Sequence, residues 1–190
     1  MIDAAVDVFW RHGYAATSIN ELTAATGLSR SSLYQRFQDK DGLFREAVTK
    51  YTQRVLTRMS ASRAATMRAR LDALLRDFLP GNAPSKRPVG YLLARSCSEM
   101  LDLTAPGRDA ALAGLAQQRA VIEAILVRAV SQEELAPDAD MDGLAWHFLG
   151  VLQAILNLPQ AGAETTSLHR MVDIAMSVWP VPPRRARKSA

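Results

Sequence analysis

The residues from Thr17 to Phe37, TSINELTAATGLSRSSLYQRF, constrain the fold of this chain more than any other stretch. Ser18 and Glu21 fit the S-x-x-E capping box, in which each side chain satisfies a free N–H group at the start of a helix. Gly27 then ends this first short helix, and Ser29 can cap a second one. Two short helices joined by a turn that contains glycine are typical of a helix-turn-helix unit.

The second of these helices, over residues 30–37, has an apolar side and a polar side. Leu33 and Phe37 are four residues apart and share the buried side, while Ser31 and Gln35 point nearly the opposite way. Hydroxyl groups can bind base edges or phosphates, glutamine suits adenine, and arginine suits guanine. The polar side therefore has the chemistry of a helix that enters a DNA groove. The alternative is that these side chains form only a solvated surface.

Helical periodicity also dominates the rest of the chain, and turn residues divide it into about nine segments with almost no strand signal. The sequence therefore predicts an all-α fold. Other helices are expected over residues 2–12, 18–26, 39–59, 66–79, 89–103, 108–134, 141–158 and 164–179. Residues 181–190 are expected to form a disordered basic tail, because the prolines beside them cannot continue a helix.

The charge of the chain does not by itself indicate nucleic-acid binding. The net charge is +4, but four basic residues lie in the tail, and the rest of the chain has 19 basic and 19 acidic side chains. An argument for DNA binding must therefore rest on where particular groups lie.

The composition also excludes several kinds of site. A single cysteine and three histidines exclude a disulfide framework and any multi-cysteine zinc site, so we expect no cofactor and no metal. No run approaches the roughly 20 apolar residues of a membrane span, so we expect no membrane partner. One cysteine fits a reducing, cytoplasmic setting.

The stretch FWRHGYAATSINELTAATGLSRSSLYQRFQDKDGLFREAV resembles the DNA-binding domain of the tetracycline-repressor (TetR) family of bacterial transcription regulators. The resemblance rests on an ordered set of residues that includes Gly13-Tyr14, Thr17-Ser18-Ile19, Gly27-Leu28-Ser29, Leu33-Tyr34 and Lys40. It implies a helix-turn-helix domain over residues 1–50 and an effector-binding and dimerisation domain over residues 51–180. The DNA-binding residues that it implies are Thr17, Ser18, Ser29, Arg30, Ser31, Ser32, Tyr34, Gln35 and Lys40.

The last two helices are expected to form the interface of a homodimer, as the resemblance implies. Both are apolar around much of their circumference, and such helices are buried on more than one side. The alternative is that they pack only within one subunit. The predicted interface residues are Phe148, Leu149, Leu152, Ile155, Leu168, Val172, Ala175 and Met176.

The resemblance also implies a ligand chamber among the middle helices. Apolar walls with a few polar groups suit a small molecule, although each of these residues could simply belong to the core. The candidates are Met67, Leu71, Leu93, Cys97, Met100, Gln118, Ile122, Trp146 and His147. An inert buried thiol is favoured for Cys97 over a redox sensor, because nothing in the sequence lowers its pKa.

These features together predict a sequence-specific DNA-binding regulator, a repressor that a small-molecule effector releases from double-stranded operator DNA. One alternative is DNA binding without an effector, for example through the basic tail. Another is an enzyme that uses Cys97 as nucleophile and His147 as base, but no glycine turn or oxyanion motif accompanies either residue.

Overall fold

The computed structural model describes residues 1–81 and 90–180, and these residues form nine α-helices, one short 3-10 helix and the turns between them. The prediction of an all-α fold is confirmed. The predicted tail at residues 181–190 lies outside the described residues. The helices are α1 (Ile2–His12), α2 (Ile19–Thr26), α3 (Arg30–Phe37), α4 (Lys40–Ala61), α5 (Met67–Asp77), α6 (Leu92–Ser98), α7 (Ala105–Ser131), α8 (Met141–Asn157), η1 (Leu158–Ala161) and α9 (Thr165–Ser177).

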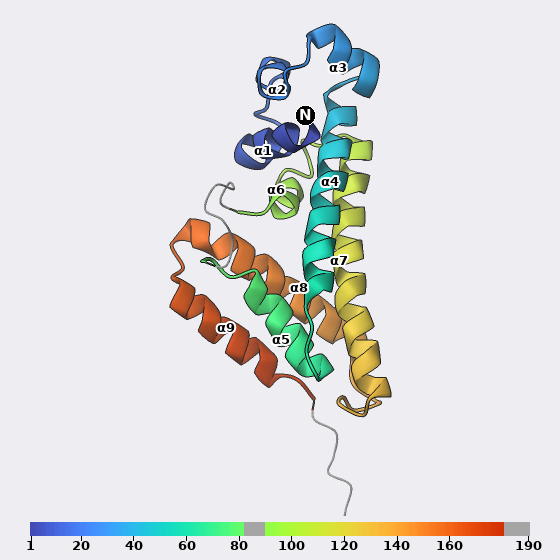
Figure 1. Ribbon diagram of the computed structural model, residues 1–190, viewed down its shortest axis with the longest axis vertical. Coiled ribbons are helices and arrows are strands. Elements are labelled where there is room, and N and C mark those ends of the chain that lie inside the picture. The colour runs from blue at the N-terminus through green and yellow to red at the C-terminus, as the bar shows by residue number, and fades with distance from the viewer. Residues whose placement is uncertain (82–89, 181–190) are drawn as a thin grey trace, which may run out of the picture.

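The molecule is elongated, with α1, α2 and α3 gathered at one end (Figure 1). We call these three helices and the first turns of α4 the head, and α5 to α9 with the rest of α4 the body. Phe9, Leu22, Leu33 and Phe44 are buried in the head, and the rings of Phe9 and Phe44 meet edge to face with centroids 5.1 Å apart. This apolar core fixes the three short helices against α4.

The helix α4 is continuous through residue 50, where the sequence places a domain boundary. Asp39 caps it, as predicted, by accepting a hydrogen bond from the Gly42 N–H at 2.7 Å. Below the head, α4 and α7 run side by side along the long axis (Figure 1). The head and the body therefore share one helix, and a displacement of the body end of α4 reaches the head directly.

Gly42 allows the start of α4 to lie against the end of α3. A Cβ atom at this position would stand 1.8 Å from the carbonyl oxygen of Phe37, which belongs to the backbone and cannot turn aside. The angle between α3 and α4 thus depends on a residue without a side chain.

The middle helices differ in length from those predicted. The helix expected over residues 89–103 is only Leu92–Ser98, because the chain turns after Ser98 and the N–H groups of Asp102 and Leu103 both bond to the Glu99 carbonyl. Thr104 then caps α7 three residues earlier than expected. The turn buries Leu103 and leaves Leu101 in solvent.

By length and composition, α7 is the one described helix that could cross a bilayer. From the sequence we expected no segment of this kind and did not identify α7. In the structure α7 packs against α4, α5, α6 and α8. Its apolar residues therefore serve helix packing.

Replacement of Gly42 by alanine should lower the free energy of unfolding by about 1–3 kcal/mol, because the new methyl group overlaps the Phe37 carbonyl. Urea unfolding at fixed protein concentration measures this change. The control Glu46→Ala, on the exposed side of α4, should stay within about 0.5 kcal/mol of the parent protein. Equal stability of the two variants would show that α3 and α4 can move apart without loss of folding stability.

Candidate DNA interface

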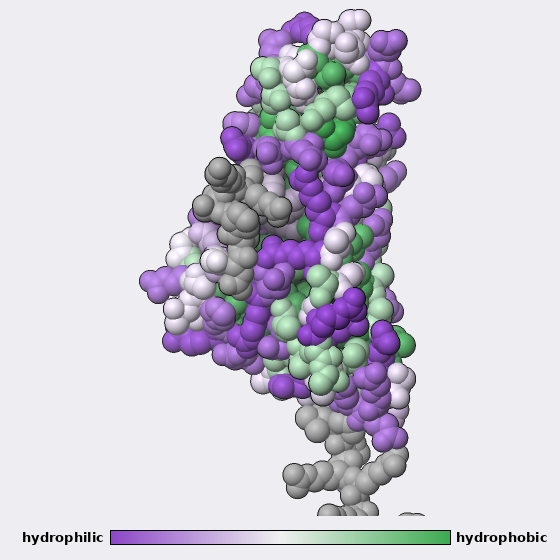
Figure 2. Space-filling view, viewed as in Figure 1, coloured by the Kyte–Doolittle hydropathy of each residue, from purple (hydrophilic) through white to green (hydrophobic). Residues whose placement is uncertain are grey.

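The outer side of α3 carries most of the predicted base-reading residues. Arg30, Ser31, Ser32 and Gln35 are exposed, and hydrophilic side chains line the outer edge of this end of the molecule (Figure 2). Leu33 and Phe37 of the same helix are buried against the head core. The helix is thus fixed from inside while its polar side faces solvent.

Ser29 and Arg30 at the start of α3 are each engaged in the structure. The Ser29 hydroxyl accepts a hydrogen bond from the Ser32 N–H at 3.0 Å, as the sequence predicts for a cap. The Arg30 guanidinium donates to the Asn20 side-chain oxygen of α2 at 2.6 Å. Sequence reasoning did not find Asn20, because only the packing of α2 against α3 brings it beside Arg30. This contact orients the guanidinium at the end of the candidate reading helix.

The start of α2 has the capping box that the sequence predicts. The Ser18 hydroxyl accepts from the Glu21 N–H at 3.2 Å, and the Glu21 carboxylate accepts from the Ser18 N–H at 2.7 Å. The Ser18 N–H, and then the Ser18 hydroxyl, which donates to the same carboxylate at 2.8 Å, lower the pKa of Glu21 from its usual value of 4.5. Thr17 is a correction: it is buried, and its hydroxyl donates to the Gly13 carbonyl at 2.5 Å. Its side chain therefore holds the turn between α1 and α2 and is shielded from solvent.

Tyr34 and Lys40, two further residues of the predicted DNA-binding set, lie on either side of the turn that ends α3. The Tyr34 ring is half-exposed, and the Lys40 ammonium stands 4.3 Å from the centre of the Tyr14 ring, a cation–π contact. Partial burial lowers the pKa of Lys40, while the carboxylates of Glu99 and Glu21 oppose this shift. The ammonium is therefore held in a defined place at the edge of the head.

A second connection between head and body is made by α6, which lies beneath α1 (Figure 1). The Tyr14 N–H donates to the Glu99 carboxylate at 2.6 Å, and Arg95 donates to the Arg11 carbonyl at 3.0 Å. Arg95 and Glu99 also form an ion pair at 3.5 Å. In the sequence, the four-residue spacing of Arg95 and Glu99 is the only sign of this ion pair. The spacing does not show which residues of α1 the pair contacts.

The structure brings only part of the predicted ligand set together. Leu93, Gln118 and Ile122 are buried in the body, as are Met67 and Leu71, and Cys97 and Met100 are half-buried. Trp146 and His147 are exposed, which contradicts their place in a chamber; the Arg119 guanidinium stacks on the Trp146 ring at 5.1 Å. The helix α8 turns these two residues outward because Phe148 and Leu149 occupy its inner side.

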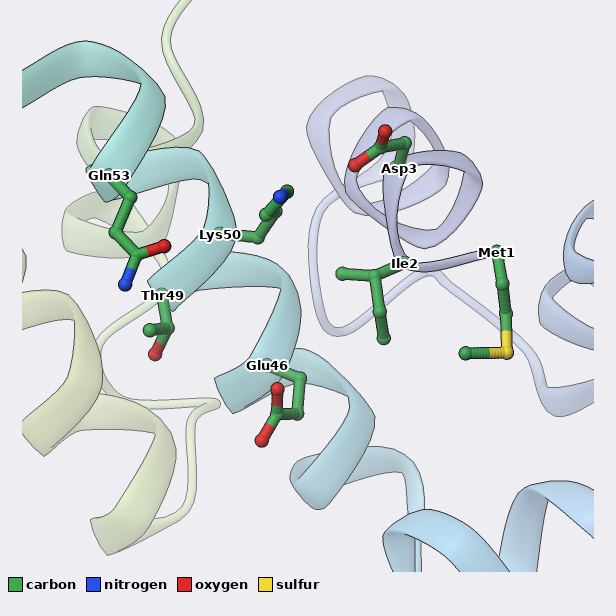
Figure 3. A pocket seen from close by; sticks show the side chains of 7 residues that line it. All are labelled: Met1, Ile2, Asp3, Glu46, Thr49, Lys50 and Gln53. Atoms are coloured by element: carbon green, nitrogen blue, oxygen red, sulfur yellow. The ribbon is translucent and has the colours of Figure 1, made fainter. Parts of the chain in front are cut away.

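Two surface pockets lie elsewhere. A pocket of about 370 Å³ lies between α1, α6 and the end of α8, and its walls include Trp10, Tyr91, Arg95, Glu99, Asn157 and Gln160. A second, of about 350 Å³, lies between the start of α1 and α4, where Met1, Ile2 and Asp3 face Glu46, Thr49, Lys50 and Gln53 (Figure 3). None of the predicted ligand residues lines either pocket.

The eight residues predicted for the dimer interface lie inside the subunit instead. All eight are buried within a single subunit: Phe148, Leu149, Leu152, Ile155, Leu168, Val172, Ala175 and Met176. The outer sides of α8 and α9 instead expose Trp146, Ile174 and Val178. Both helices have more than one apolar stripe, and the sequence does not show which stripe faces the core.

The only cysteine, Cys97, is half-buried in α6, and burial raises the pKa of its thiol. A raised pKa disfavours the thiolate that a nucleophile or redox sensor requires. No hydrogen bond joins Cys97 to His147 among residues 1–81 and 90–180. Over the same residues, no group of histidine, cysteine and carboxylate side chains could hold a metal ion.

Two family profiles match the chain. Residues 1–47 match the profile described as "Bacterial regulatory proteins, tetR family", and residues 68–175 match "Tetracyclin repressor-like, C-terminal domain". The chain belongs to the TetR family. Its members are DNA-binding transcription regulators, and the prediction from the first fifty residues is confirmed.

Relatives and solved structures extend the match over nearly the whole chain. The transcriptional repressor ComR of Escherichia coli is 25% identical over 183 residues, which cover 94% of this chain and 87% of ComR. The repressor AcnR of Corynebacterium diphtheriae is 25% identical over 92% of this chain and 86% of AcnR. A cysteine mutant of the TetR family regulator CifR, in complex with 26-bp operator DNA, has a TM-score of 0.80 at 28% identity, with 94% of each chain covered.

The capping box makes α2 sensitive to acid. Because the folded state lowers the pKa of Glu21, its contribution is complete above about pH 4.5 and is lost as the pH falls through the lowered value. The melting temperature of the parent protein should therefore fall more steeply below pH 4.5 than that of Glu21→Gln. Thermal unfolding followed by circular dichroism between neutral pH and pH 3 tests this.

The matched control is Glu46→Gln, which replaces an exposed α4 glutamate that accepts no hydrogen bond in the described part of the chain. It should follow the parent protein at every pH. Parallel curves for the parent and Glu21→Gln would mean that the capping carboxylate does not stabilise α2.

Proposed function

We propose that this regulator is a homodimeric repressor that binds operator DNA through α3 and leaves it when a small molecule binds the body. The observation that carries the proposal is the two-sided α3, whose Leu33 and Phe37 are buried while Ser31 and Gln35 face solvent. The relatives ComR and AcnR are named as repressors, and CifR is seen on operator DNA. These likenesses support repression.

In this proposal the predicted residues divide into two groups. Arg30, Ser31, Ser32 and Gln35 face the bases, because they occupy the exposed side of a helix that is short enough to enter the major groove. Ser18, Tyr34 and Lys40 hold the phosphates on either side of it. The capped start of α2 supports this role for Ser18, since free N–H groups at a helix start favour an anion.

The proposed dimer interface uses the outer sides of α8 and α9. Ile174 is 70% exposed in the single subunit and Trp146 is 56% exposed, and a second copy packed against these helices would remove both side chains from water. Two copies related by a twofold axis would present two α3 helices, as reading of two major grooves about 34 Å apart requires.

Two elements would carry the effector signal to DNA. The helix α4 runs from the body to the head without a break, and α6 holds the end of α1 through Arg95 and Glu99. A ligand that binds better to one arrangement of these helices shifts the heads toward that arrangement. The spacing of the two α3 helices then no longer fits the DNA, and the repressor dissociates.

Measurements of DNA binding distinguish the residues proposed to face the bases from those proposed to hold the phosphates. Lys40→Ala should weaken binding to every duplex and reduce the salt slope by about 1, whereas Gln35→Ala should relax the preference at one base pair by about 1–3 kcal/mol. Selection from a random duplex library, followed by titration at several salt concentrations, measures both effects. The controls Lys50→Ala and Gln53→Ala change exposed residues of α4 outside the head.

The control variants should bind as the parent protein does. If the parent protein selects no sequence from the library, or if Lys50→Ala weakens binding as much as Lys40→Ala, then α3 is not the reading element.

A charged substitution tests whether the outer side of α9 belongs to the dimer interface. Ile174→Arg should convert the dimer to a monomer, because it would bury an unpaired guanidinium between the two copies. The control Leu112→Arg changes an apolar residue of α7 that is 54% exposed, and it should remain dimeric. Light scattering on a size-exclusion column gives the mass of each. A dimeric Ile174→Arg would exclude this side of α9 from the interface.

A further inference from the structure

Four uncharged polar side chains converge in the body, on different segments of the chain. Thr52 of α4 is 3% exposed, Tyr91 before α6 is 2% exposed and Gln118 of α7 is fully buried. Gln153 of α8 joins them, because its side-chain N–H donates to the Gln118 oxygen at 3.2 Å. We call these four residues the polar cluster. They lie within a body whose other buried side chains are almost all apolar.

Each member of the polar cluster has an atom left unpaired. Across the described residues, no hydrogen bond of good geometry is made by Thr52 Oγ1, Tyr91 Oη, Gln118 Nε2 or Gln153 Oε1, although the two amides lie near the Tyr91 hydroxyl. A buried polar group without a partner costs about 1–3 kcal/mol. The summed cost of four such unpaired groups is more than packing alone explains. A bound molecule that pairs with these atoms would recover this free energy.

The positions of the four residues make one site of them. The amides of Gln118 and Gln153 lie close enough to Tyr91 to act on the pKa of its hydroxyl, which burial raises. On α7, Gly114 lies one turn before Gln118, and a Cβ atom there would stand 2.7 Å from Thr52 Oγ1. The missing side chain at Gly114 thus lets α7 pack closely against the Thr52 hydroxyl of α4, within the polar cluster.

The pocket between α1, α6 and α8 adjoins the polar cluster at Tyr91. Tyr91 belongs to both, and Asn157 of the pocket wall donates to the Gln153 carbonyl at 2.7 Å. Trp10 also lines this pocket, and its indole N–H has no partner among the residues described. The pocket volume of about 370 Å³ limits the occupant to a small molecule.

The charges around the site exclude an ion as the occupant. None of the four cluster side chains is charged, and the enclosure of an unpaired charge is far less favourable than that of a neutral group. Arg95 and Glu99 at the pocket wall already pair with each other and with the backbone of the head. The polar cluster itself therefore offers neutral donors and acceptors only, and the two opposite charges at the pocket wall balance each other.

The geometry points to a small uncharged molecule with both a hydrogen-bond donor and an acceptor, such as an amide or an alcohol, held by the polar cluster with its apolar part between Trp10 and Tyr91. This inference rests on the proposed effector-responsive function and names the chemical class of the effector. The same pocket touches Arg95 and Glu99, so its occupant acts directly on the contacts that attach α6 to the end of α1.

The probes for the test are benzamide and benzyl alcohol, with benzoate and benzylammonium as charged counterparts of similar shape. The readout is the indole N–H signals of the three tryptophans in the ¹⁵N-labelled full chain, assigned with Trp10→Phe. Both neutral probes should shift the Trp10 signal. The Trp179 signal should stay in place, because its indole already donates to the Glu134 carbonyl at 3.1 Å. The charged probes should bind at least about tenfold more weakly.

Gln118→Leu removes one amide from the polar cluster, and Gln117→Leu makes the same change on the exposed side of α7. Gln118→Leu should weaken benzamide binding by about tenfold. The melting temperature of this variant, which also loses the hydrogen bond from Gln153, shows whether it remains folded. Tyr91→Phe should weaken benzamide similarly, and Gln117→Leu should bind it as the parent protein does.

Several results would overturn the inference. Water alone fills the site if neither neutral probe shifts Trp10 at its highest soluble concentration. Equal binding of benzoate, or unchanged benzamide binding by both Gln118→Leu and Tyr91→Phe, would place the probe elsewhere. The titration needs no DNA, so it can succeed for a chain that selects no operator; in that case the proposed function fails and the ligand site stands.

Discussion

The position of α3 depends on its contact with the first turn of α4. Leu33 and Phe37 anchor the helix from inside, and Gly42 lets the Phe37 carbonyl approach the α4 backbone more closely than any side chain would permit. Because α3 has only eight residues, its own hydrogen bonds give little stability, and tertiary packing must hold it. The exposed polar side has a fixed direction only as a consequence of this contact.

The head is attached to the body in two different ways. The helix α4 is a covalent and continuous connection, whereas α6 contacts α1 through side chains and can change its contacts without breaking a helix. Tyr14 lies at the meeting point, since its backbone N–H donates to the Glu99 carboxylate while Lys40 packs on the face of its ring. A shift of α6 would therefore reach the same lysine that is proposed to hold a phosphate.

Much of the DNA-reading end was predictable from sequence, and much of the body was not. The capping box at Ser18 and the caps at Ser29 and Asp39 were found because each depends on residues three apart along the chain. The prediction for α8 failed at Trp146 and His147, which face outward, and the eight residues expected between subunits lie within one. An apolar helix shows that it is buried, but not which neighbour covers each side.

The sequence by itself determined the helical content, the helix starts in the head and the membership of a family of DNA-binding regulators, because these follow from local spacing and an ordered motif. The tertiary structure alone decided that Asn20 orients Arg30 and that Thr52, Tyr91, Gln118 and Gln153 converge. The physical reason is that both arrangements arise from packing between helices. Segments far apart in the chain meet there at distances that no local pattern encodes.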